Sequence, residues 1–295
     1  MSYAQTSVPA SNALEAGNGG VAAVRVRLLG GFLVERAESA LPDSAWQQRR
    51  SAKALIKLLA THPRHALHRE QILEILWPDV RTESSLNSFA KALHAARRAL
   101  EPELRPRDSS AYLHLRDDVL SLDTKHVLVD ADLFQQLAES ALQRGHPSFE
   151  TALAAYPGEL LPEDRYKDWS EERRSHLAEL YIRLQLKRAD SLHQRGESSL
   201  AVDHLHAALQ QDPVREEAHR RLMLIYASTG MRYKAVRQFQ LCQDALKREL
   251  DMRPDAKTTA LFRSILAEDS QRSASSRVDG RQRVLARRSP PAGRR

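Results

Sequence analysis

Apolar and polar residues alternate at the start of the patterned part of the chain, from Val24 to Leu29. This period of two is typical of a strand with one buried face. Gly30 and Gly31 supply a turn, and the run Phe32-Leu33-Val34 predicts a second strand. We therefore expect the folded part of the chain to open with a pair of short strands.

Three helices are predicted after these strands, because apolar residues recur there at every third or fourth position. Their approximate ranges are 48–61, 68–76 and 84–100. Pro63, the Trp77-Pro78 pair and Pro102 follow the three helices in turn. Proline ends a helix because it lacks the backbone N–H that a helix interior requires.

A β-hairpin is predicted after the third helix. Residues 112–115 and 119–122 both alternate between apolar and polar positions, and Arg116-Asp117-Asp118 joins them. Strands, three helices and a hairpin in this order form the winged variant of the helix-turn-helix. The sequence therefore predicts a winged-helix DNA-binding domain at 23–125, whose third helix enters the major groove.

The pattern from Asp130 to about residue 270 is helical throughout. Residues of similar size recur in it at a spacing of 34, as at Gly196 and Gly230 or Ala201 and Ala235. This period is typical of tetratricopeptide repeats, in which small residues lie where paired helices touch. We expect a mainly α protein whose second domain, 127–270, is an all-α tetratricopeptide-like repeat. An irregular helical bundle with chance spacing is the alternative.

The net charge of +7 is located at the C-terminal end of the sequence. Residues 271–295 contain eight arginines and a single acid, Asp279, so the rest of the chain is close to neutral. DNA binding must therefore be argued from a local face rather than from the total charge. We expect residues 1–22 to be a disordered lead and residues 271–295 to be a disordered basic tail.

One face of the third predicted helix carries no acidic residue. On a helical wheel, the core side contains Leu86, Phe89, Leu93, Ala96 and Leu100. The opposite side contains Ser84, Asn87, Ser88, Lys91, Ala95 and Arg98, with His94 at its margin. A solvated helix of this length usually includes acids, so this face suits base edges and phosphates. An amphipathic helix that lacks acids by chance is the alternative.

Within this face, the best candidates for contacts with base edges are Asn87, Ser88 and Lys91. Arg98 lies toward the far end of the helix, where a phosphate contact is expected. Arg97 points near the core side, and for this residue a structural role is as well supported as a DNA contact.

Two further groups are candidate phosphate contacts. Arg49, Arg50 and Lys53 lie at the start of the first predicted helix, where a solvated helix face is the alternative. Arg116 and His114 are the weaker candidates of the hairpin. These residues complete the predicted DNA-binding set.

Several short segments, taken together in their order and spacing, resemble the SARP regulators of antibiotic pathways. More widely, they resemble proteins that join an OmpR-type winged helix to a bacterial transcriptional activator domain (BTAD). The segments cover about residues 24–268 and are Val26–Gly30, Arg69–Asp79, Ser85–Phe89, Leu93–Leu100, Val129–Phe134, Tyr156–Leu161 and Asp168–Arg173.

This resemblance implies sequence-specific binding to promoter DNA, often at direct repeats, recruitment of RNA polymerase, and self-association through the activator domain. The sequence departs from the family at Ala111, where such hairpins often have glycine before the tyrosine. The ATPase and additional repeats of large members are absent from it. We therefore expect a short-form member or the front of a longer product, without a receiver domain before the winged helix.

No enzyme activity, cofactor or metal site is predicted. The sequence lacks a glycine-rich segment followed by Lys-Ser or Lys-Thr, so a nucleotide phosphate loop is not expected. His62, His65 and His68 are evenly spaced, but a nearby cysteine or carboxylate pair that would complete a metal site is missing. The single cysteine, Cys242, favours a reducing cytoplasm, and no run is long enough for a membrane span.

Two other functions compete with DNA-binding regulation. One is a helical-repeat adaptor between proteins, with a winged-helix head that does not read DNA. The other is an RNA-binding protein that uses the arginine-rich tail, and it depends on that tail alone.

Overall fold

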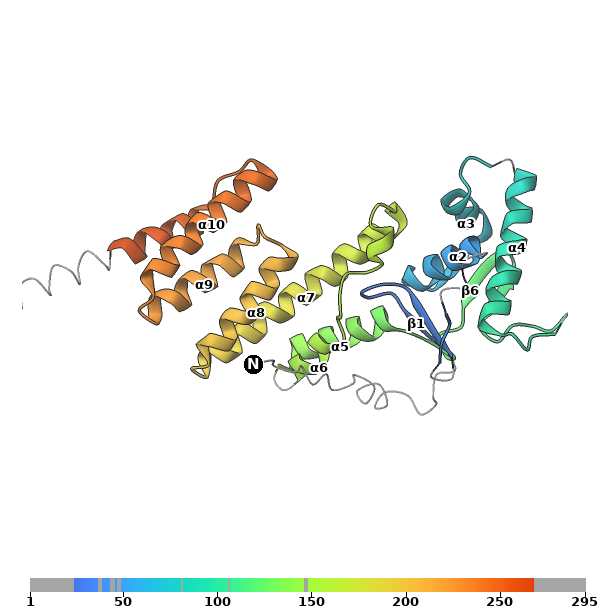
Figure 1. Ribbon diagram of the computed structural model, residues 1–295, viewed down its shortest axis with the longest axis horizontal. Helices are drawn as coiled ribbons and strands as arrows, with labels where there is room; N and C mark the ends of the chain where they lie inside the picture. Colours follow the sequence, from blue (N-terminus) through green and yellow to red (C-terminus); the bar gives the residue numbers. More distant parts are fainter. Residues whose placement is uncertain are drawn as a thin grey trace, which may run out of the picture. The chain divides into compact units, whose positions relative to one another are not determined.

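The computed structural model of the protein describes residues 24–36, 39–42, 46, 49–80, 82–105, 107–145 and 148–267. The chain divides into two compact units, one ending at Leu184 and the other beginning at Gln185. Figure 1 shows strands confined to the N-terminal part and helices elsewhere, which confirms the mainly α fold class. The expected disordered lead, 1–22, and basic tail, 271–295, lie outside the described residues.

A four-stranded sheet opens the first unit. Its strands, in their order across the sheet, are β3 (Ser39–Ala40), β2 (Leu33–Arg36), β1 (Val24–Arg27) and β7 (Val127–Val129). β1 pairs antiparallel with β2, as the alternating pattern predicts. It also pairs in parallel with β7, a pairing that the sequence pattern does not predict. Val24, Val26 and Val34 are fully buried, so one face of this sheet belongs to the hydrophobic core.

The three predicted helices are present and begin and end within two residues of the predicted ranges. They are α2 (Arg50–Thr61), α3 (Arg69–Leu76) and α4 (Thr82–Leu100). A second sheet has the strand order β4 (Ala66–His68), β6 (Val119–Leu122) and β5 (Leu113–Arg116). α2 packs against α4 and also touches β6. Three helices followed by the β5–β6 hairpin form the winged-helix arrangement that the sequence predicts.

The segment that follows this head returns to the first sheet. Asp130 is the first residue of α5 (Asp130–Arg144), and its carboxylate accepts the backbone N–H groups of Leu28 at 2.7 Å and Leu29 at 3.1 Å. The backbone N–H of Leu161 also donates to the carbonyl of Leu28, at 2.8 Å. The end of β1 is therefore held by residues on the far side of the predicted boundary between the two domains.

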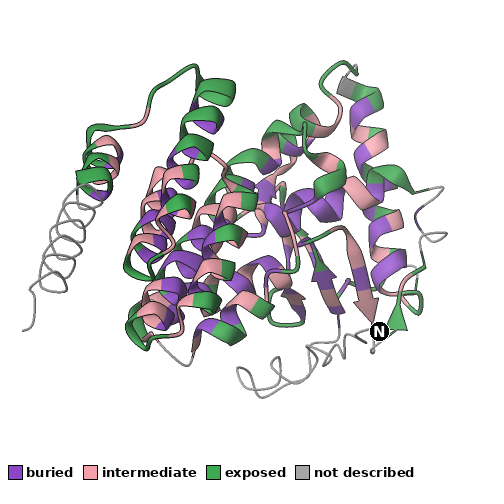
Figure 2. Cartoon of the chain, turned by 60° about the vertical axis from the view of Figure 1, so that its left-hand side comes forward, coloured by how far each residue is buried: buried purple, intermediate pink, exposed green. Residues whose placement is uncertain are grey.

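Helices make up nearly all of the rest of the described chain. They are α6 (Ser148–Ala154), the short 3-10 helix η2 (Pro162–Asp164), α7 (Asp168–Gln194), α8 (Ser198–Gln211), α9 (Glu216–Ser228), α10 (Arg232–Leu250) and a final helix at 256–267. Figure 2 shows that these helices carry buried residues along one side and exposed residues along the other. This distribution is the one expected of amphipathic helices that each pack one side against neighbouring helices.

The second unit shows the predicted helical repeat. Gly196 precedes α8 and Gly230 precedes α10, and both have left-handed backbone angles, with φ of 81° and 79°. Glycine adopts this conformation without the steric cost that other residues meet. Ala201 and Ala235 are fully buried at equivalent positions of α8 and α10. Small residues therefore lie where the helices pack, as the spacing of 34 predicts.

Candidate nucleic-acid interface

The α4 helix separates its apolar and polar residues as predicted. Phe89, Leu93, Ala96 and Leu100 are buried, whereas Leu86 is only half-buried. The exposed residues of the opposite side are Ser84, Asn87, Lys91, His94 and Arg98. Five of the six residues predicted on this helix to contact DNA therefore face solvent, and the sixth, Ser88, is half-buried.

The polar side chains of this face differ in how much of their hydrogen-bonding capacity is already used within the protein. The Ser88 hydroxyl donates to the carbonyl of Ser84 at 2.8 Å, so only its oxygen lone pairs remain for a ligand. Arg98 donates to the carbonyl of Leu104 at 2.9 Å, which draws it toward the end of the helix. Over the described residues, Asn87 and Lys91 have no such side-chain contact, so their full hydrogen-bonding capacity is available.

The start of α4 adds one acidic residue that the predicted helix did not include. The helix begins at Thr82, two residues earlier than predicted, and Glu83 is exposed in its first turn. A carboxylate in this position interacts favourably with the positive end of the helix dipole. The acid-free stretch therefore runs from Ser84 to Leu100, as the sequence predicts, but a negative charge stands directly before it.

The β5–β6 hairpin is the wing of the head. Its turn consists of Asp117 and Asp118, whose φ angles of 47° and 62° are left-handed. Arg116, the predicted phosphate contact of the wing, is exposed next to this turn. Asp118 forms an ion pair with Arg69 at 3.0 Å, while Asp117 is exposed. The tip of the wing thus presents one basic and one acidic side chain to solvent.

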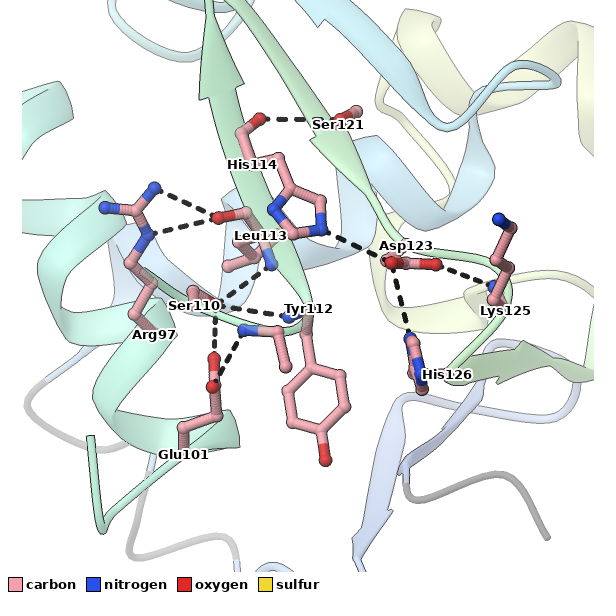
Figure 3. Close-up of polar contacts among 11 residues, drawn as sticks. Arg97, Glu101, Ser110, Tyr112, Leu113, His114, Ser121, Asp123, Lys125 and His126 are labelled. Atoms are coloured by element: carbon pink, nitrogen blue, oxygen red, sulfur yellow. Dashed lines mark hydrogen bonds and ion pairs between the residues drawn. The ribbon is translucent and has the colours of Figure 1, made fainter. Parts of the chain in front are cut away.

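Polar contacts join the end of α4 to the first strand of the wing (Figure 3). Arg97 donates from Nε and Nη2 to the carbonyl of Leu113, at 3.2 and 3.0 Å. Glu101, one turn later, accepts the Ser110 hydroxyl and, at 2.9 Å, the N–H of Ala111. Of the two roles considered for Arg97, the structural one is therefore observed.

His114, the other wing candidate, is engaged within the protein. Its Nε2 lies 3.3 Å from Asp123 Oδ2, and His126 Nδ1 lies 3.3 Å from the same oxygen (Figure 3). Partial burial alone would raise the pKa of Asp123, but the N–H of Lys125 and the two imidazoles together lower it. The carboxylate of Asp123 therefore holds His114 at the base of the wing.

The second predicted group lies at the start of α2. Arg49 and Arg50 are exposed, and the half-buried Lys53 places its Nζ 5.2 Å from the centroid of the Phe32 ring. A cation over an aromatic face is held by the ring quadrupole. Lys53 is thus partly committed to Phe32, and Arg49 and Arg50 are the freer phosphate candidates of this group.

The three evenly spaced histidines have separate structural environments. His65 Nε2 lies 2.8 Å from Asp132 Oδ2, and its Nδ1 lies 3.1 Å from the carbonyl oxygen of Leu59. Burial alone would lower the pKa of His65, but Asp132 raises it above its ordinary value. His68 caps α3 by accepting the N–H of Glu70. Across the described residues, no group of three His, Cys, Asp or Glu side chains is arranged to hold a metal ion.

None of the helices that the structure describes combines the length and the apolar character that crossing a membrane requires.

Residues that sequence reasoning missed at this site are Glu101 and Ser110. Ser110 is almost fully buried, and its oxygen accepts the N–H groups of Tyr112 at 3.2 Å and Leu113 at 3.0 Å. The one available signal was that Arg97 and Glu101 are four residues apart and therefore project from the same side of a helix end. The contacts themselves depend on where the wing returns, which the local pattern does not show.

Comparison with known proteins agrees with this architecture. Residues 129–266 match the family described as bacterial transcriptional activator domain. Among solved structures, the chain is similar to EmbR from Mycobacterium tuberculosis in complex with a low-affinity phosphopeptide. The TM-score is 0.65 at 18% sequence identity, and the match covers 92% of this chain and 73% of EmbR. A search of curated proteins found no match. Residues 129–266 therefore match a bacterial transcriptional activator domain, and the fold of the chain is similar to that of EmbR.

Proposed function

We propose that this protein is a sequence-specific regulator of transcription that binds double-stranded DNA at promoters. In this proposal α4 enters the major groove, the wing meets the neighbouring backbone, and the activator domain contacts RNA polymerase. The protein acts in the cytoplasm, at the nucleoid. The family also implies DNA sites that are direct repeats, and self-association as a homodimer. Sedimentation of the full chain, with and without a duplex, tests whether it forms a dimer.

One observation carries the proposal: α4 exposes Asn87 and Lys91 on a face that has no acid between Ser84 and Leu100, and neither side chain is engaged by the described protein. An asparagine amide matches the N6 and N7 atoms of adenine, and a lysine ammonium donates to O6 and N7 of guanine. Both groups lie one helical turn apart and project to the same side. This spacing allows them to contact neighbouring base pairs in one groove.

Selection of bound duplexes from a random pool tests the proposal with the full chain. We expect an enriched sequence motif for the wild type and its loss in the double variant Asn87→Ala, Lys91→Ala. Lys125→Ala removes an exposed lysine outside α4 and serves as the matched control, which should keep the motif. Failure of the wild type to enrich any motif would contradict the proposal.

A protein-binding adaptor is the second candidate, and the exposed apolar side chains of the repeat unit favour it. Leu224 is 51% exposed and Tyr233 is 71% exposed. Exposed apolar groups of this size occur at protein interfaces, although single ones are common on any surface. This candidate predicts that the protein retains its partner when Asn87 and Lys91 are replaced, while no duplex is selected.

A further inference from the structure

The strand β5 lies at the open edge of the second sheet, with β6 on its other side. The two-residue turn Asp117-Asp118 makes Arg116 and Val119 the hydrogen-bonded pair that closes the hairpin. Backbone groups alternate in direction along a strand, so three residues earlier those of Leu113 point away from β6. The N–H and the carbonyl of Leu113 therefore need partners from outside the sheet.

Side chains at the end of α4 provide these partners. The carbonyl of Leu113 accepts two N–H groups of Arg97, and its N–H donates to the Ser110 hydroxyl oxygen, which is itself bonded to Glu101 (Figure 3). Leu113 is fully buried, so leaving either backbone group without a partner would be costly. Arg97 and Glu101 thus fix both backbone groups of the residue at which the wing begins.

We propose that Arg97 is a positioning residue for DNA recognition: it sets the wing at the distance from α4 that lets Arg116 reach the phosphate backbone. This inference rests on the proposed function. Arg97 is half-buried and directed at Leu113, so it acts through the wing rather than by touching DNA. Arg98, its neighbour, is exposed and remains a candidate for direct phosphate contact.

A double-mutant cycle on the full chain tests the inference, with duplex affinity measured over a series of salt concentrations. Loss of one phosphate contact lowers the slope of log affinity against log salt by about 1. We expect Arg116→Ala, made in the otherwise wild-type chain, to reduce the magnitude of the slope by this amount. Arg97→Gln alone should reduce the magnitude equally. Arg116→Ala made in the Arg97→Gln chain should cause little further change. Independent, additive effects of the two substitutions overturn the inference.

Two controls separate positioning from general loss of structure. Lys91→Ala should weaken binding by the same factor in the Arg97→Gln variant as in the wild type, because α4 itself remains intact. Arg97→Lys keeps the charge and one donor, and it should restore part of the slope; it also replaces Arg97→Gln if that variant fails to fold. A reduced effect of Lys91→Ala in the Arg97→Gln background contradicts the inference, because it means that the whole head is disturbed.

Amide hydrogen exchange tests the same contact without DNA. We expect residues 112–116 to exchange faster in Arg97→Gln, while residues 84–96 of α4 keep their protection. Unchanged exchange in 112–116 overturns the inference. If the wild type selects no duplex, the proposed function fails and the positioning role fails with it. If the wild type selects a duplex but the effects of Arg97→Gln and Arg116→Ala are additive, only the positioning role is overturned.

Discussion

The Nζ atom of Lys57 lies 2.8 Å from Oε1 of Glu163 and joins the first helix of the winged-helix head to the activator domain. Asp164 is a second partner of the same ammonium, at 2.5 Å. The Lys57 side chain is almost completely buried, so its charge depends on these two carboxylates. We expect the double variant Glu163→Gln, Asp164→Asn to lower the free energy of unfolding by about 3–5 kcal/mol, since a buried charge loses its partners.

Urea unfolding followed by tryptophan fluorescence measures this effect. All three tryptophans of the chain lie in the first compact unit, at Trp46, Trp77 and Trp169. The matched control is the triple variant Lys57→Met, Glu163→Gln, Asp164→Asn, which removes the buried charge together with its partners and should cost within about 1 kcal/mol. Equal destabilisation by the control and the double variant would show that packing, and not charge pairing, accounts for the effect.

Asp130 predicts a pH dependence of stability. Burial raises its pKa from 3.8 to about 6, although backbone N–H groups of Leu28, Leu29 and Ala131 oppose the shift. The folded chain then binds the proton more tightly than the unfolded chain, so the contribution of Asp130 to the free energy of unfolding is complete below about pH 4. This contribution is lost as the pH rises through about 6.

Between pH 4 and pH 7, we expect the unfolding free energy of the wild type to fall relative to that of Asp130→Asn. The expected change in the difference is on the order of 2–3 kcal/mol. Denaturant titrations of both proteins at several pH values provide the measurement. A constant difference across this range would mean that Asp130 has an ordinary pKa in the folded protein.

Asp117, at the tip of the wing, places a negative charge beside the predicted phosphate contact Arg116. One unit charge acting over about 8 Å through water contributes about 0.5 kcal/mol. We expect Asp117→Asn to raise affinity for any duplex about twofold at low salt, without changing the selected motif. Asparagine also tolerates the left-handed turn conformation, so the wing geometry is kept. Unchanged affinity for both operator and scrambled duplexes would place the wing tip away from the backbone.

The buried alanines of the repeat predict a packing defect on enlargement. Ala235 is fully buried in α10, whereas Gln240 on the same helix is exposed. Ala235→Leu should destabilise the second unit by roughly 1–3 kcal/mol, because extra methylene groups are forced into a packed interior. Gln240→Leu introduces the same side chain at the surface and should leave stability nearly unchanged. Amide hydrogen exchange of α9 and α10 in the full chain measures the stability of both variants. Equal protection in the two variants would contradict the close packing of Ala235 between the repeat helices.

Local pattern predicted the elements of the head well, because each helix carries its own apolar stripe and is followed by proline. The outward face of α4 could be identified for the same reason, since Asn87 and Lys91 lie opposite Phe89 and Leu93 on any helical wheel. The phosphate roles of Arg49, Arg50 and Lys53 remain predictions.

Long-range pairing was not predictable from the same patterns. β7 has only three residues, Val127 to Val129, and its partner β1 lies about a hundred residues earlier in the chain. The contact of Arg97 with Leu113 likewise depends on where the hairpin returns relative to the helix end. Both features depend on tertiary packing, which short apolar runs do not specify.

The base preference of Asn87→Ala decides whether α4 reads the DNA sequence. Binding of the full-length wild type and variant is measured on a set of duplexes that covers every single-base change in the selected site. We expect Asn87→Ala to lose about 1–3 kcal/mol of discrimination between bases at one position of the site and to keep it at the others. Glu83→Gln, one turn earlier on the same helix, is the control. It should leave the order of base preference unchanged at every position of the DNA site. An identical preference profile for wild type and Asn87→Ala would mean that α4 is not the element that reads the DNA.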